Sequence, residues 1–143
     1  MNKLEALILS WKNSAQPFIF QGEKVVTYGE LFDLVAKTRE HLSKATPSPQ
    51  SFVIEGENSL TSYVKLISLL ASGHAVHGCP TYQFHDQKYR DFLESQTQTR
   101  FCWCPNEDQF ENAARISAPA LHPEIKSGFD AGRKQLIIRT SGT

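Results

Sequence analysis

The chain has no excess charge, no long apolar run and few cysteines. Its 143 residues include 15 basic and 15 acidic side chains, so the formal net charge is zero. A nucleic-acid-binding surface needs clustered Lys and Arg, and because the sequence has no such cluster we expect no nucleic-acid partner. No stretch approaches the roughly 20 apolar residues of a membrane span, so we expect no membrane crossing.

The amino terminus does not resemble a secretion signal. The apolar residues 7–9 lie between Glu5 and Lys12, which leaves too short a stretch for the apolar region of a signal peptide. We therefore expect a cytoplasmic location. In that compartment the three cysteines, Cys79, Cys102 and Cys104, are expected to be free thiols.

Histidine and cysteine occur close together in two places, which raises the question of a zinc site. His74 and His77 precede Cys79, and Cys102 and Cys104 follow later. In a strand, His77 and Cys79 would share one face. No pair has the Cys-x-x-Cys spacing of structural zinc sites, and buried cysteine is usually a small apolar side chain. The pattern favours core packing, and we expect no metal ligands here.

The hydrophobic pattern predicts alternating helices and strands after an amino-terminal helix and hairpin. Thr27 and Glu30 have the spacing of a capping box, and residues 46–49 have linker composition. The expected elements are a helix at 4–11, a hairpin at 18–26, a helix from 28 to about 44, a strand at 51–55, a buried helix at 60–72, a strand at 75–79, a helix at 85–96, a strand at 101–104, a short helix at 108–115, a loop at 117–133 and a strand at 135–139. Such alternation predicts an α/β fold with a mostly parallel sheet flanked by helices.

The last four residues have the composition of a phosphate-binding loop, and they follow directly on the last predicted strand. These candidate ligand-binding residues are Thr140, Ser141, Gly142 and Thr143. Glycine allows close approach of the backbone, successive N–H groups can converge on an anion, and the hydroxyls add donors. The loop lacks the Gly-Lys-Ser/Thr of the P-loop and the glycines of a dinucleotide fingerprint. It also lacks the Gly-x-Ser-x-Gly of serine hydrolases, so Ser141 is not expected to be a nucleophile.

With three earlier motifs, this loop makes the chain resemble the AMP-forming adenylating enzymes. That family contains acyl-CoA synthetases, adenylation domains of nonribosomal peptide synthetases, and luciferases. The matching stretches are the Thr-Tyr-x-Glu-Leu of residues 27–31, the strand leading to Asn-Ser at residues 52–59, the Gly-x-Ala-x-x-x-x-Pro of residues 73–80 and the Thr-Ser-Gly-Thr of residues 140–143. Two stretches depart from the family's pattern. Glu55-Gly56-Glu57 replaces a more apolar approach to Asn-Ser, and residues 77–79 replace larger apolar residues.

The resemblance implies that residues 1–143 form the N-terminal portion of the large domain of an adenylate-forming enzyme and end inside its phosphate loop. The implied parent is an ATP-dependent, carboxylate-activating ligase. It would form acyl-AMP and pyrophosphate and then an acyl thioester. Its implied cofactors are ATP and Mg²⁺, and its implied partners are a carboxylic acid and CoA or a carrier protein. The loop would hold the β- and γ-phosphates. Within these 143 residues the resemblance implies no catalytic residue, no bound cofactor and no activity.

A second class of function stays open, namely a stand-alone, non-catalytic binding or assembly module with the same fold. Whether the chain belongs to an enzyme is therefore undecided by sequence. If the chain is instead part of a longer adenylate-forming enzyme, we expect exposed apolar surface, or self-association that covers it. Isolated aromatic and histidine residues are given structural roles: Trp11, Tyr28 and Trp103 are expected in the core or an interface, and His41, His85 and His122 at the surface.

Overall fold

A computed structural model describes residues 2–46, 48–105 and 136–138, the last three as backbone only. The amino-terminal part consists of two helices and a hairpin, α1 (Lys3–Ser10), β1 (Pro17–Gln21), β2 (Lys24–Thr27) and α2 (Tyr28–Ala45). The two strands are antiparallel and turn at Gly22, which has a φ of +62°. The predicted capping box is present on its Thr27 side, where Oγ1 accepts a hydrogen bond from the Glu30 N–H at 3.1 Å.

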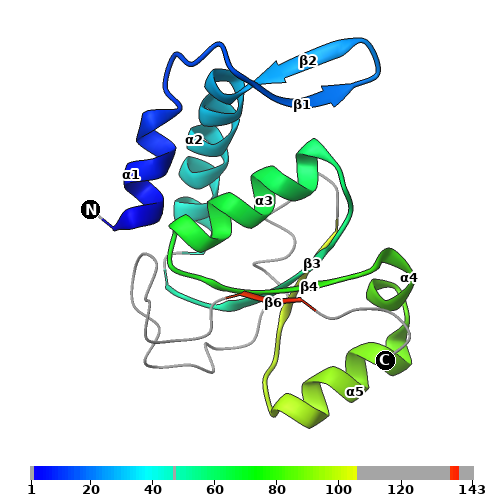
Figure 1. Cartoon of the computed structure of the whole chain (residues 1–143). Coiled ribbons are helices and arrows are strands. Elements are labelled where there is room, and N and C mark those ends of the chain that lie inside the picture. Colours follow the sequence, from blue (N-terminus) through cyan, green and yellow to red (C-terminus); the bar gives the residue numbers. More distant parts are fainter. Residues whose placement is uncertain (1, 47, 106–135, 139–143) are drawn as a thin grey trace.

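The rest of the described chain forms a parallel sheet with helical crossovers (Figure 1). Its elements are β3 (Ser51–Glu55), α3 (Leu60–Ala71), β4 (Ala75–Cys79), α4 (Thr81–Phe84), α5 (Gln87–Thr97), β5 (Cys102–Cys104) and β6 (Leu136–Ile138). The strand order is β5-β3-β4-β6, and every pairing in this sheet is parallel. The predicted class, a mostly parallel α/β sheet flanked by helices, is therefore confirmed.

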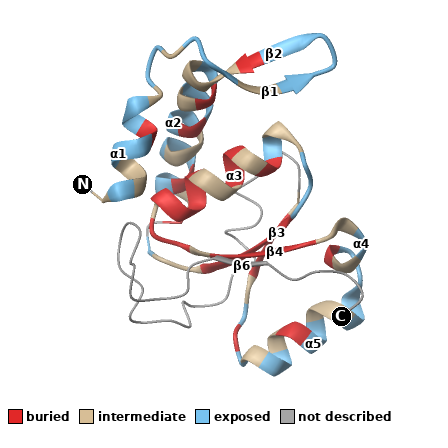
Figure 2. Cartoon of the chain, viewed as in Figure 1, coloured by how far each residue is buried: buried red, intermediate tan, exposed pale blue. Residues whose placement is uncertain are grey.

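The sheet buries both of its faces because apolar residues occur at successive positions of the strands (Figure 2). On one face, Phe52, Ile54 and Val76 pack with Leu42 of α2 and Leu69 of α3. On the other face, Val53, Cys79 and Trp103 pack with Phe84 of α4 and Leu93 of α5. A third group joins the amino-terminal helices, with Ile8, Leu31, Val35, Val64 and Ala71 at its centre.

Element boundaries differ from the predictions by more than one residue in one region. Residues 81–84 form a separate short helix, α4, and the next helix begins at Gln87 instead of residue 85. Asp86 accounts for the later start, because its side chain accepts a hydrogen bond from the Lys88 N–H at 3.0 Å and caps α5. One turn of helix is too short for an apolar periodicity. The helix predicted at 108–115 and the loop at 117–133 lie outside the described residues.

His74 joins the start of β4 to the segment before β3. It is 2% exposed, and its Nδ1 accepts a hydrogen bond from the Gln50 N–H at 3.0 Å. Its ring lies edge-on to Phe52, with 5.0 Å between centroids. Burial lowers the pKa of His74 from 6.5 to about 4. The folded chain therefore holds this ring neutral at a pH where the unfolded chain would protonate it.

We predict that stability falls as pH falls from about 6.5 to about 4, because the unfolded state binds the extra proton in this window. At 1.36 kcal/mol per pKa unit, His74 should contribute a loss of about 3 kcal/mol in the free energy of unfolding. Urea unfolding at pH 7 and at pH 4 measures this loss in the free energy of unfolding. In His74→Asn the amide oxygen can still accept the Gln50 bond, and most of this pH dependence should disappear. An unchanged pH slope in that variant would show that other groups cause it.

Arg90 of α5 joins that helix to α4 and to the sheet. Its guanidinium carbon lies 4.9 Å from the centroid of the Phe84 ring and 4.6 Å from that of Trp103. Its Nε also donates a hydrogen bond to the Phe84 carbonyl oxygen at 2.7 Å. A planar guanidinium can stack and donate in the plane at once, whereas an ammonium group cannot.

Arg90→Lys should therefore lower the free energy of unfolding by about 1–2 kcal/mol although the charge is kept. Thermal or urea unfolding at pH 7 measures the change. Arg100 is exposed and serves as the matched control, since Arg100→Lys should change stability by less than about 0.5 kcal/mol. Equal changes in the free energy of unfolding for the two variants would show that the stacking of Arg90 on Phe84 and Trp103 does not stabilise the fold.

Candidate functional site

The predicted phosphate loop comes after β6, and the structure establishes where that strand ends. Thr140, Ser141, Gly142 and Thr143 themselves lie outside the described residues. β6 runs parallel to β4, with Ile138 beside Gly78. The carboxyl ends of β3, β4, β5 and β6 therefore lie at one edge of the sheet, which we call the carboxyl edge. In open α/β sheets this edge is where ligands bind.

The turn from β3 into α3 is held by side-chain hydrogen bonds at this edge. Ser62 Oγ donates to the Glu55 carbonyl oxygen at 2.7 Å and accepts from the Glu57 N–H at 3.3 Å. Ser59 caps α3, because its hydroxyl oxygen accepts from the Ser62 N–H at 3.2 Å. The Tyr63 hydroxyl donates to Asn58 Oδ1. The Asn-Ser pair of the sequence motif therefore has a defined structural role in starting the helix.

The same turn contacts the end of the neighbouring strand β4. The Gly56 N–H donates to the Cys79 carbonyl oxygen at 2.7 Å. A Cβ on Gly56 would lie 3.4 Å from that oxygen, which is an ordinary van der Waals contact. Beyond the strand, Thr81 Oγ1 donates to Glu57 Oε1 at 2.7 Å. The ends of β3 and β4 are thus joined by one backbone bond and one side-chain bond.

Two buried charged residues lie beside this turn. Lys65 of α3 is 2% exposed and its Nζ donates to the Pro105 carbonyl oxygen, just past the end of β5. Glu55 ends β3 and is 6% exposed, with one carboxylate oxygen 3.4 Å from His85 Nε2. We call Glu55, Glu57, Ser62, Lys65, Thr81 and His85 the carboxyl-edge cluster. It brings together carboxylate, hydroxyl, ammonium and imidazole groups from both sides of the sheet.

Sequence reasoning identifies only part of this cluster. The Glu55-Gly56-Glu57 stretch stands out as a departure from the family's pattern, but Lys65 is missed. The one signal for it is that Lys65 is the only charged residue in the apolar helix α3. A charge in such a helix must be solvated or paired, and here it is buried with a carbonyl partner.

The three cysteines and the described histidines do not come together as one metal site. Cys102 and Cys104 belong to the cluster under α2 and α3, whereas Cys79 belongs to the cluster on the opposite face, where His77 lies near Phe101. All three cysteines are buried and none forms a disulfide, and Cys102 Sγ donates a hydrogen bond to Gln50 Oε1 at 2.7 Å. Burial raises the pKa of Cys79 to about 11, with a further rise from the Glu55 carboxylate, and burial also raises the pKa of Cys104. These thiols are small core residues, as the sequence favoured.

Within residues 2–46, 48–105 and 136–138, no three His, Cys, Asp or Glu side chains form a group that could hold a metal ion. The Mg²⁺ implied by the resemblance therefore has no such set of ligands in this part of the chain. Glu55 and Glu57 are the acidic residues of the carboxyl-edge cluster, and each is already in contact with a neighbouring side chain.

Most of the remaining predictions for single aromatic and histidine residues are confirmed. Tyr28 packs against Trp11 and Phe18 with ring centroids 5.5 and 5.3 Å away, and Trp103 is 7% exposed. His41 is exposed, as expected. The side chain of His85 is 58% exposed, but it contacts Glu55 and is therefore more than a solvated surface residue. His122 lies outside the described residues.

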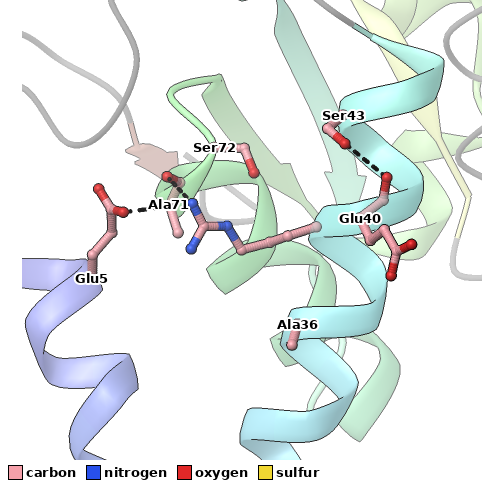
Figure 3. A pocket seen from close by; sticks show the side chains of 7 residues that line it. Glu5, Ala36, Glu40, Ser43, Ala71 and Ser72 are labelled. Carbon is pink, nitrogen blue, oxygen red and sulfur yellow. Dashed lines mark hydrogen bonds and ion pairs between the residues drawn. The ribbon is translucent and has the colours of Figure 1, made fainter. Parts of the chain in front are cut away.

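A surface hollow of about 620 Å³ lies among α1, α2 and α3, away from the carboxyl edge (Figure 3). Arg39 Nη2 donates there to the Ala71 carbonyl oxygen at 3.1 Å and lies 3.8 Å from Glu5. Ala71 ends α3, so the arginine satisfies a carbonyl at the helix terminus. The side chain has a structural role in this hollow.

Large apolar side chains are exposed mainly on the amino-terminal elements and on α4 and α5. They are Leu7, Leu9, Phe20, Val25, Leu34, Tyr82 and Phe92. Phe20 and Val25 are paired across the hairpin, where Phe20 is 68% exposed. None of the described helices combines the length and apolar character needed to span a bilayer.

Comparison with known proteins gives a structural likeness and no sequence match. No protein-family model matches the chain, and no curated protein sequence matches it. Among solved structures it is similar to PA1221, an NRPS protein containing adenylation and PCP domains, with a TM-score of 0.57 and 19% sequence identity. The likeness covers 95% of this chain and 27% of PA1221. The chain therefore spans about a quarter of the length of that neighbour. At this identity the likeness shows the fold.

Proposed function

We propose that this chain is the phosphate-binding part of a carboxylate-activating ligase of the AMP-forming type. The observation with most weight is the fold likeness to an adenylation and PCP protein over 95% of the chain. The second support is the parallel pair β4–β6, because Ile138, which lies at the carboxyl edge beside Gly78, is two residues before Thr140 in the sequence. Four motif stretches of the sequence, taken in order, agree with both observations.

In this proposal the last four residues bind the β- and γ-phosphates of ATP. The hydroxyls of Thr140, Ser141 and Thr143 and the N–H of Gly142 are the donors, and such donors are strengthened by a charged acceptor. The carboxylic acid attacks the α-phosphorus and pyrophosphate leaves. The rate then depends mainly on alignment and on the stabilisation of charge. Mg²⁺, when bound with the nucleotide, supplies further charge neutralisation, and no described residue set of this chain is assigned to it.

We further propose that the 143 residues do not adenylate a substrate by themselves. The likeness covers only 27% of the solved neighbour, so most of the neighbour's residues have no counterpart in residues 1–143. Holding ATP in line for attack requires contacts to the ribose, the base and the acid as well as to the phosphates. The acyl acceptor proposed for the intact enzyme is the thiol of CoA or of a carrier protein.

Carboxylate-dependent ATP–pyrophosphate exchange should occur with the complete gene product and not with residues 1–143 alone. Ser141→Ala and Thr140→Ala should each remove one donor to a charged phosphate, worth roughly 1.5–3 kcal/mol. The expected loss in kcat/KM for ATP is on the order of 10- to 150-fold. Exposed Ser43 on α2 provides the control, because Ser43→Ala removes only a local bond to the Glu40 carbonyl oxygen.

The outcomes of this assay separate the hypotheses. Exchange by residues 1–143 alone would show that they contain all the essential parts. Unchanged ATP kinetics in Ser141→Ala would remove the phosphate-loop assignment. No exchange by the complete gene product with any of a broad panel of carboxylic acids would favour the non-catalytic module.

A further inference from the structure

We propose that Glu57 is a positioning residue of the carboxyl edge. Its carboxylate joins the β3–α3 turn to the start of α4, directly after β4, and so supports the end of β4 and, through the β4–β6 pair, Ile138, two residues before the predicted phosphate loop. The importance of that point rests on the proposed function, whereas the positioning itself involves only described residues. The contacts that carry it run from the β3–α3 turn to β4 and then to β6.

Glu57 is held in place on its own side by the backbone of the turn. Its N–H donates to the Glu55 carbonyl oxygen at 3.0 Å and to Ser62 Oγ at 3.3 Å. Ser62 is 5% exposed and its hydroxyl in turn donates to the same Glu55 oxygen. Because the backbone at Glu57 is bonded to a strand end and to a buried helix residue, its side chain extends from a fixed base.

The carboxylate bonds to the chain just after β4. Glu57 Oε1 accepts from Thr81 Oγ1 at 2.7 Å, and Thr81 begins α4 two residues past the end of the strand. The backbone bond from Gly56 reaches Cys79, the last residue of β4, and does not itself reach α4. The Glu57–Thr81 bond adds a second point of attachment, and its 2.7 Å is the ordinary length of an O–H···O hydrogen bond.

The position of β6 depends on β4. Within the described residues β6 pairs with β4 alone, through the partners Val76–Leu136, His77–Ile137 and Gly78–Ile138. A displacement at the end of β4 is therefore passed directly to Ile138. Catalytic alignment is sensitive to shifts of about 1 Å, so a small displacement at this point matters for a loop that must hold phosphates.

The surroundings of Glu57 argue against a purely stabilising role. Glu57 is exposed, and its bond to Thr81 is a surface contact. Exposed contacts of this kind contribute little to folding stability. Loss of the bond should consequently change the geometry of the edge while leaving the unfolding midpoint almost unchanged, and this combination distinguishes positioning from stabilisation.

The test uses the ¹⁵N-labelled chain of 143 residues with two disruptive and two conservative variants. Glu57→Ala and Thr81→Val remove the bond, whereas Glu57→Gln and Thr81→Ser keep an acceptor or a hydroxyl. Exposed Glu23 in the hairpin provides the charge-matched control, Glu23→Ala. We expect both disruptive variants to shift the Gly78 and Ile138 amide resonances in the same direction, and the double variant to add nothing. The conservative variants and the control should leave these resonances in place, with unchanged urea midpoints throughout.

A second measurement connects the position to ATP. In the complete gene product, Glu57→Ala should raise KM for ATP by roughly 3- to 10-fold, the range for one lost hydrogen bond, with KM for the carboxylic acid unchanged. If the wild type shows no pyrophosphate exchange, the proposed function fails, and the amide resonances still decide the role of Glu57. Unshifted Gly78 and Ile138 resonances in both disruptive variants, or equal shifts accompanied by a large fall in the urea midpoint, would overturn the proposal.

Discussion

The parallel pairing of β3 with β4 is the constraint on which the other elements depend. Five residues of each strand are in register, from Ser51 beside Ala75 to Glu55 beside Cys79. β5 pairs with the outer side of β3 and β6 with the outer side of β4. The crossover from β3 to β4 contains α3, whose buried side chains pack with both strands. Because all four strands point the same way, their carboxyl ends meet at one edge.

This pairing also explains where the polar residues of the chain are concentrated. At the amino ends of the strands, His74 is buried neutral and bonded to Gln50. At the carboxyl ends, Glu55 and Lys65 are buried beside hydroxyl groups and strand carbonyls. Buried charges are costly unless they are paired or hydrogen-bonded, and a chain tends to keep them where geometry or chemistry requires them. The carboxyl edge thus holds buried charged groups at the place where open α/β sheets bind their ligands.

Most of the fold could be predicted from local pattern. The Thr27–Glu30 spacing indicated the start of α2, Asn58-Ser59 preceded α3, and Phe52-Val53-Ile54 indicated a strand buried on both faces. α4 could not be found, because a single turn has no period and is defined by its contacts with β3 and α5.

The candidate site could be predicted from the sequence less completely than the fold. Thr81 and Glu57 are 24 positions apart, and their contact exists only because β3 and β4 end side by side. Lys65 lies 40 positions from its partner Pro105. The split of the cysteines between two faces likewise depends on which helices cover each face, as Cys79 and Cys104 illustrate. The phosphate-loop residues Thr140–Thr143 stay a prediction, since they lie outside the described residues.

The complete protein is proposed to activate a carboxylic acid by transferring the adenylyl group of ATP to the carboxylate, with pyrophosphate as the leaving group. Isotope transfer tests this most directly, because adenylation leaves one carboxylate oxygen on the phosphorus when the acyl group is passed to a thiol. The complete gene product would be incubated with ATP, Mg²⁺, CoA and a panel of ¹⁸O-labelled carboxylic acids, and the nucleotide products examined by mass spectrometry. We predict AMP containing one ¹⁸O atom for at least one acid. Formation of ADP and phosphate, or of AMP without ¹⁸O, would contradict the proposed adenylation.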